Sequence, residues 1–192
     1  MNPTSKKGVT SMPEDNKGTT YSFDVCGQCK IICCQDAKPP LTQKRKKLIK
    51  KYLGKENIQV EKLFVKKDYS YPAVDELVFC RLYNKETGKC WVHPVKPETC
   101  KAGPITFDIN FSAKKVEWFL KKSELCAFAG VLFKNQEAFK EHFKEATLEL
   151  ARLIQELTPE ELRAIVKIEE PQTFKVGEDD LPLDVVKKLG LK

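Results

Sequence analysis

Two kinds of hydrophobic periodicity follow one another along this chain of 192 residues. From Ile105 to Phe111 apolar and polar residues alternate, and the same alternation returns from Val116 to Leu120 after a turn at 112–115. A period of two is typical of a half-buried strand, because successive side chains point to opposite faces. The two segments therefore predict a hairpin of two antiparallel strands.

Helical spacing replaces this alternation toward the C-terminus. Between Gln136 and Leu157 apolar residues recur every three or four positions, which predicts one long helix. The segment Thr158-Pro159-Glu160-Glu161 reads as a capping box and predicts a second helix that runs to about Ile168. Residues 183–189 predict a last turn or two before Gly190.

The first half of the chain carries weaker signals. Thr42 is the predicted N-cap of a helix that ends near Gly54 and buries Leu48, Ile49, Tyr52 and Leu53. Val60–Val65 is a weak strand candidate, and Phe79–Val92 predicts a hairpin around a polar turn. Together these elements predict an α+β fold.

The chain divides into three expected parts. Residues 1–20 are polar and lack periodicity, which predicts a disordered tail. Residues 21–130 hold all eight cysteines and are expected to form a small domain of hairpins and one basic helix that is organised by metal, because its polar loops bury little apolar surface. Residues 131–192 are expected to form a helical extension packed on that domain.

Neither a secretion signal nor a membrane span is expected. Residues 1–20 have no apolar core, and no apolar run is long enough to cross a bilayer. The expected location is therefore cytoplasmic, where thiols stay reduced and clustered cysteines bind metal more often than they form disulfides.

The cysteines are the strongest chemical signal in the sequence. The first four follow a C-x2-C-x3-C-C pattern, and two-residue spacing lets both thiolates of a tight turn reach one ion. All eight are predicted metal ligands: Cys26, Cys29, Cys33, Cys34, Cys80, Cys90, Cys100 and Cys126. They predict zinc, or one or two iron–sulfur clusters, with [4Fe–4S] as one form.

The adjacent pair Cys33-Cys34 constrains how the ligands divide. In an extended segment their side chains point to opposite faces, so either one thiol is not a ligand or the pair feeds two sites or one polynuclear cluster. Eight cysteines also allow four disulfides with 105 connectivities, or simple burial in a core. We favour metal because of the compartment and the spacing.

Positive charge is concentrated in the first half of the chain. Residues 1–100 carry 19 basic and 11 acidic side chains, whereas residues 101–192 carry 15 and 16. Seven of the basic residues crowd the predicted helix after Thr42: Lys44, Arg45, Lys46, Lys47, Lys50, Lys51 and Lys55. An acidic partner would fit them, but a solubilising face that also balances anionic metal sites is favoured. Nucleic acid is not favoured, because aromatic residues are not interleaved.

The cysteine segments resemble the YkgJ-type cysteine-cluster family over residues 21–130. The run from Phe23 to Cys34, then Cys80 and Cys90, and the segment Lys96-Pro97-Glu98-Thr99-Cys100-Lys101 carry the resemblance. The first cluster has one extra residue, and Lys96 and Lys101 stand where the family has arginines. The resemblance implies a zinc- or iron-chelating domain, and a similar domain occurs in flagellin lysine-N-methylases.

Two functions are consistent with these signals. The first is a binding or electron-transfer module that acts with a partner protein. The second is an iron–sulfur-dependent transferase or methylase-like enzyme acting on a protein or small molecule. The first is favoured because no catalytic signature is found in the sequence. His93 is interpreted as a surface or packing residue near Cys90, and His142 as part of a solvated helix face.

Overall fold

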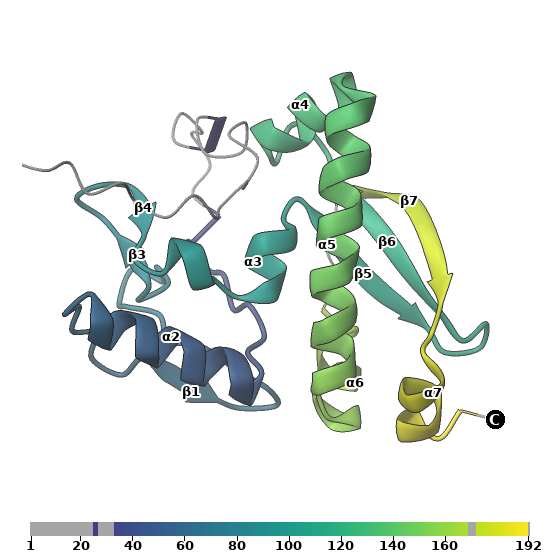
Figure 1. The fold of residues 1–192 in the computed structure, drawn as a ribbon, viewed down its shortest axis with the longest axis horizontal. Helices are drawn as coiled ribbons and strands as arrows, with labels where there is room; N and C mark the ends of the chain where they lie inside the picture. The colour runs from purple at the N-terminus through teal and green to yellow at the C-terminus, as the bar shows by residue number, and fades with distance from the viewer. Residues whose placement is uncertain (1–24, 27–32, 169–171, 192) are drawn as a thin grey trace, which may run out of the picture.

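The computed structural model describes residues 25–26, 33–168 and 172–191. These residues form a mixed α+β fold, as predicted. Figure 1 shows two parts side by side, one built around helix α2 and the other around helix α5, with the short helix α3 between them. The predicted tail at residues 1–20 lies outside the described residues.

The part around α2 contains the short hairpins. Helix α2 spans Gln43–Lys55, strands β1 (Phe64–Lys66) and β2 (Ser70–Pro72) pair antiparallel, and so do β3 (Tyr83–Asn84) and β4 (Lys89–Cys90). The second pair confirms the hairpin predicted within Phe79–Val92. Only the last part of the strand candidate at 60–65 is a strand.

Helix α2 begins where the sequence predicts. The Thr42 hydroxyl accepts a hydrogen bond from the Arg45 backbone N–H (3.0 Å), which satisfies one of the open donors of the first turn. Ile49 and Leu53 are buried, whereas Leu48 is 42% exposed. The predicted apolar stripe is therefore wrong at Leu48, which lies too far around the helix to reach the core.

The second part contains a three-stranded antiparallel sheet of β5 (Ile105–Asn110), β6 (Lys115–Lys121) and β7 (Thr173–Asp180). The predicted hairpin is β5–β6, in which Ile105 lies opposite Leu120. Strand β7 was not predicted, because its charged and mostly exposed residues carry no clear alternation. The indole N–H of Trp118 on β6 donates to Asp179 on β7 (2.7 Å).

Four helices accompany this sheet. They are α4 (Ala127–Lys134), α5 (Gln136–Glu156), α6 (Pro159–Ile165) and α7 (Leu183–Leu189). The long helix, the capping box at Thr158 and the terminal turn before Gly190 are confirmed. Helix α4 was not predicted, and α6 ends three residues before the predicted Ile168.

The two parts have separate hydrophobic cores. The sheet core is the larger and packs the sheet against α4–α7, with Trp118, Leu150 and Leu153 among its most buried side chains. The cysteine-side core consists of Leu41, Ile49, Leu53, Cys80, Leu82 and Val92. Helix α3 (Glu98–Ala102), preceded by a 3-10 turn at His93–Val95, packs against α5 and joins the two.

The division at residue 130 remains a proposal. Strand β7 belongs to the expected extension and completes the sheet begun by β5 and β6, which belong to the expected domain. None of the helices in the described residues combines the length and the hydrophobicity that crossing a bilayer requires.

Candidate metal centre

Backbone pairing brings distant cysteines together. The Cys80 N–H donates to the Cys34 carbonyl (2.8 Å), and Gln35 forms an antiparallel bridge with Phe79. The β3–β4 hairpin then returns the chain so that Cys90 lies opposite Tyr83, whose N–H donates to the Cys80 carbonyl (2.8 Å). Three separate segments of the sequence therefore meet here, and α3 adds Cys100 as a fourth.

Cys33 and Cys34 lie in a turn rather than in an extended segment. Their side chains share a hydrogen bond, so the argument from an extended segment does not apply to this pair. This hydrogen bond and, to a smaller extent, the charges of Lys96 and Lys121 lower the pKa of Cys33 to about 6. Desolvation of the Cys33 thiolate opposes this shift. The same bond, together with burial and neighbouring thiols, raises the pKa of Cys34. The pair therefore favours one thiol and one thiolate.

The remaining thiols of this group shift one another's pKa. Burial raises the pKa of Cys80 to about 11, and Cys90 and Cys33 add to the shift. Burial likewise raises the pKa of Cys90, with a further contribution from Cys33. Desolvation by the surrounding protein raises the pKa of Cys100, and the thiols of Cys80 and Cys90 raise it further. The Cys100 residue nevertheless keeps solvent access.

We call these five side chains the thiol cluster: Cys33, Cys34, Cys80, Cys90 and Cys100. They are thiols rather than disulfide halves, and they come from four segments of the chain. Groups that raise one another's pKa lie within electrostatic reach, and a cation placed among them would relieve the repulsion between their thiolates.

The other three predicted ligands have different positions. Cys126 precedes α4 as its N-cap residue and packs against the sheet core. Cys26 is exposed, and its neighbour Val25 contacts the same core. Cys29 lies outside the described residues. Within the described ranges no three or more His, Cys, Asp or Glu side chains are arranged to hold a metal ion, so the thiols converge without a finished coordination shell.

Unpaired polar atoms occur close in sequence to two members of the thiol cluster. Among the described side chains, three buried polar atoms lack a hydrogen-bond partner: Arg81 Nε, Glu98 Oε2 and Thr99 Oγ1. Each lies within two residues of Cys80 or Cys100. Buried polar groups are normally paired, and two of these atoms are donors that an anionic metal–thiolate centre would attract. The donor set and its surroundings thus fit a zinc or iron–sulfur centre.

The charged residues around Cys100 have distinct partners. The charge of Lys96 lowers the pKa of Cys33 and opposes the upward shifts of Cys90 and Cys100, so this side chain faces the thiol cluster. Lys101 instead pairs with Glu149 on α5 (2.5 Å). His93 is exposed, and desolvation by nearby protein atoms, followed by the charge of Lys96, lowers its pKa.

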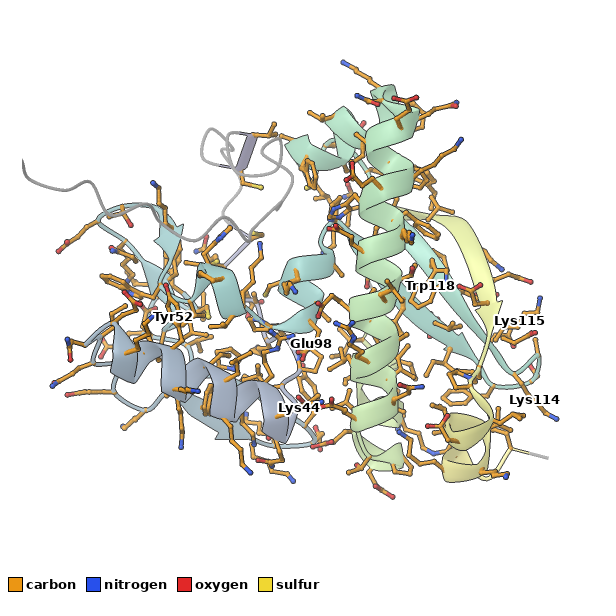
Figure 2. All side chains as sticks on the ribbon, in the orientation of Figure 1. Lys44, Tyr52, Glu98, Lys114, Lys115 and Trp118 are labelled. Carbon is orange, nitrogen blue, oxygen red and sulfur yellow. The ribbon has the colours of Figure 1, made fainter. Side chains whose placement is uncertain are left out.

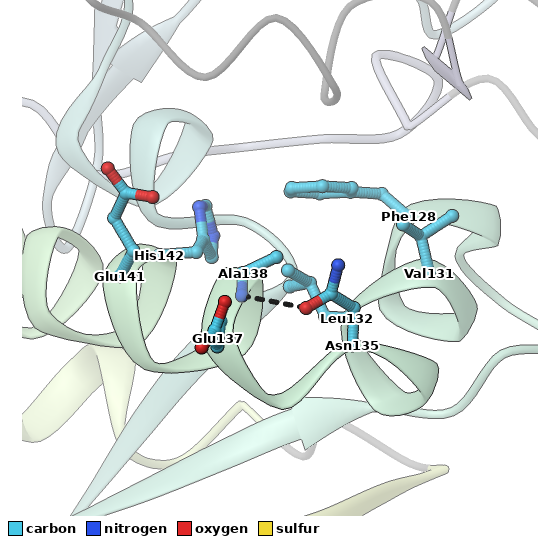
Figure 3. Close-up of a pocket in the computed structure, with 8 residues that line it drawn as sticks. All are labelled: Phe128, Val131, Leu132, Asn135, Glu137, Ala138, Glu141 and His142. Carbon is cyan, nitrogen blue, oxygen red and sulfur yellow. Dashed lines mark hydrogen bonds between the residues drawn. The ribbon is translucent and has the colours of Figure 1, made fainter.

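His142 lies in the sheet-core part rather than on a solvated face, so that interpretation is wrong. It is only 6% exposed, its Nε2 donates to the Ala102 carbonyl (3.1 Å), and its ring meets Phe128 edge-on. The residue helps line a hollow of about 180 Å³ between α4 and α5, in which Asn135 caps α5 through the Ala138 N–H (Figure 3). This volume is smaller than that of typical ligand sites.

One set of charged residues next to α3 was not predicted from the sequence. Arg45 on α2 contacts Glu98 on α3 and Glu149 on α5. Glu98 belongs to the cysteine motif itself, which is the only signal that pointed to it. Arg45 looked like one more surface cation in a basic helix.

Comparison with known proteins agrees with this chemistry. Residues 25–127 match the model of the CxxCxxCC family, described as "Putative zinc- or iron-chelating domain". No curated protein and no solved structure gives a significant match. The match covers more than half of the chain and includes every member of the thiol cluster, and the chain therefore belongs to the CxxCxxCC family.

Proposed function

We propose that this protein binds zinc or an iron–sulfur cluster through its cysteines and serves a partner protein as a binding or electron-transfer module in the cytoplasm. The backbone pairing of the Cys34 and Cys80 segments, which the β3–β4 hairpin follows with Cys90 and α3 with Cys100, carries the proposal. Membership of a zinc- or iron-chelating family supports the same chemistry.

The eight cysteines divide into two groups in this proposal. Cys34, Cys80, Cys90 and Cys100 form the first, since backbone pairing and mutual pKa effects link them. The other four complete a second ion site or the far side of one polynuclear cluster: Cys26, Cys29, Cys33 and Cys126. The Cys33–Cys34 turn would then join the two groups, and Lys121, close to Cys126 in sequence, acts on Cys33.

When bound, zinc would cross-link the segments, and an iron–sulfur cluster would also accept and donate an electron. The protein's own contribution is to hold the thiols together and keep them partly buried. Lys96 supports their ionised form, because its positive charge offsets part of the charge that four thiolates bring.

Elemental analysis tests this function. Anaerobically purified protein is assayed for zinc, iron and acid-labile sulfide, and the expected result is at least one metal ion per chain. Sulfide together with absorption near 400 nm identifies an iron–sulfur cluster. The Cys80→Ser variant is expected to lose metal, whereas Ser70→Ala, a buried serine of the same part, keeps it. Folded protein with less than about a tenth of a metal equivalent would sink the proposal.

The outer face of α2 is the proposed contact for an acidic protein partner. Lys44, Lys47, Lys51 and Lys55 recur at helical spacing and are exposed. Reversal of the last three charges should weaken capture of an acidic partner in a salt-dependent manner, while metal content stays unchanged. Bound S-adenosylmethionine would instead favour the methylase-like alternative, for which the structure offers no specific observation.

A further inference from the structure

A buried network of ion pairs joins the metal-centre part of the molecule to the C-terminal helices. Arg45 Nε donates to Glu98 Oε1 (2.8 Å), and Arg45 Nη2 donates to Glu149 Oε2 (3.2 Å). The three side chains are 12%, 7% and 12% exposed, so solvent screens them little. Figure 2 shows Glu98 at the lower end of α3, where α2 and α5 come close.

The same network continues to the other end of α3. Lys101 Nζ donates to Glu149 Oε1 (2.5 Å), and the His142 imidazole donates to the Ala102 carbonyl. Glu149 and His142 are seven residues apart, so they share a face of α5. Glu98, Lys101 and Ala102 are therefore all tied to neighbouring helices, and together they make up most of α3.

The remaining residue of interest on α3 is Cys100. At about 100° per residue, Glu98, Lys101 and Ala102 fall on one side of the helix, and Cys100 falls roughly 200° from Glu98. The contacts with α2 and α5 hold one face of α3, and the opposite face carries the thiol. A shift or rotation of α3 would move Cys100 relative to the other members of the thiol cluster.

We propose that Arg45, Glu98 and Glu149 are positioning residues for the metal centre. They clamp α3 between α2 and α5, so that the docking of α5 fixes the Cys100 ligand. This inference rests on the proposed function, and it adds that one residue beyond the matched family region, Glu149, helps to set the affinity for metal. Arg45 suits this role because its planar guanidinium reaches two carboxylates at once.

The experiment compares Glu149→Gln with Glu156→Gln. Glu156 also joins α5 to α2 through Lys44 (3.2 Å), and it makes a matched control because that pair lies at the exposed edge. Zinc affinity is measured by chelator competition on reduced full-length protein, and the thiolate-to-cobalt charge-transfer band is recorded after loading with Co²⁺ alone. Glu149→Gln should bind zinc about 10- to 100-fold more weakly and give a weaker band, whereas Glu156→Gln should match wild type.

A second variant guards against simple misfolding. Arg45→Lys keeps the charge but cannot bridge both carboxylates, so it should remain folded by circular dichroism and show a smaller loss of affinity. Affinity and band intensity equal to wild type in both Glu149→Gln and Arg45→Lys would overturn the inference and leave the proposed function standing. A wild-type protein that binds neither metal would overturn the proposed function instead.

Discussion

His142 is the residue whose position departs most from its sequence context. Its neighbours Glu141 and Glu145 are charged and exposed, yet the ring packs on Phe128 and reaches Ala102. Burial has the largest effect on the pKa of His142 and lowers it. The Ala102 hydrogen bond and the charge of Glu145 oppose this shift. The folded protein therefore holds a neutral imidazole at physiological pH.

This burial makes stability depend on pH. Because the folded pKa lies below the unfolded value of about 6.5, the contribution of His142 is complete above that value and is lost as the pH falls through the folded pKa. Urea unfolding between pH 7.5 and 5 should show a decline of up to about 1.4 kcal/mol per pH unit that is absent in His142→Gln. Comparison with the variant cancels the pH dependence of the thiols, and equal slopes in both proteins would contradict the prediction.

At the scale of elements, helix ends follow local chemistry closely. The Thr158 hydroxyl accepts from the Glu161 N–H (3.2 Å), and the Glu161 carboxylate accepts from the Thr158 N–H (3.1 Å). This reciprocal pair needs only residues within one turn. The sequence therefore predicted it, as it predicted Thr42 at the start of α2.

The cap at Thr158 gives a prediction for this element. Thr158→Ala should lower the free energy of unfolding by about 1 kcal/mol, because the Glu161 backbone N–H loses the hydroxyl that accepts its hydrogen bond. Thr147→Ala, in the middle of α5, should be neutral or slightly stabilising, because alanine is the better helix former. Chemical denaturation of both variants checks the difference, and equal stabilities would show that the cap contributes nothing.

At the scale of the whole molecule, the two cores are unequal. In the described part of the chain the sheet core has eighteen buried residues, and the cysteine-side core has six. Six apolar side chains supply little hydrophobic stabilisation, so the part that carries the thiol cluster depends more on whatever its thiols bind.

Metal removal should therefore affect the two parts differently. When a chelator strips the reduced protein, the amides of α2 and of the β3–β4 hairpin should exchange hydrogen much faster, while those of β5, β6 and the middle of α5 keep most of their protection. Hydrogen-exchange mass spectrometry of the loaded and stripped protein measures this. Uniform loss over both parts, or none in either, would contradict the prediction.

Features that depend only on neighbouring residues were predicted from the sequence. Period-two alternation located β5 and β6, helical spacing located α5, and cap residues located the starts of α2 and α6. The cysteine spacing indicated metal chemistry and the family, because two thiolates of one tight turn can reach the same cation. These features follow from short-range geometry and need no knowledge of the fold.

Which distant groups meet became visible only in the folded structure. Cys34 lies beside Cys80 because strand-like segments pair across a long loop, and no local pattern encodes that pairing. Arg45 looked like a surface cation until Glu98 and Glu149, which lie 53 and 104 residues away, proved to be its partners. Strand β7 was missed because most of its side chains face solvent, where periodicity is weak. Long-range contacts result from how the hydrophobic faces pack together, so they become visible only when the chain is folded.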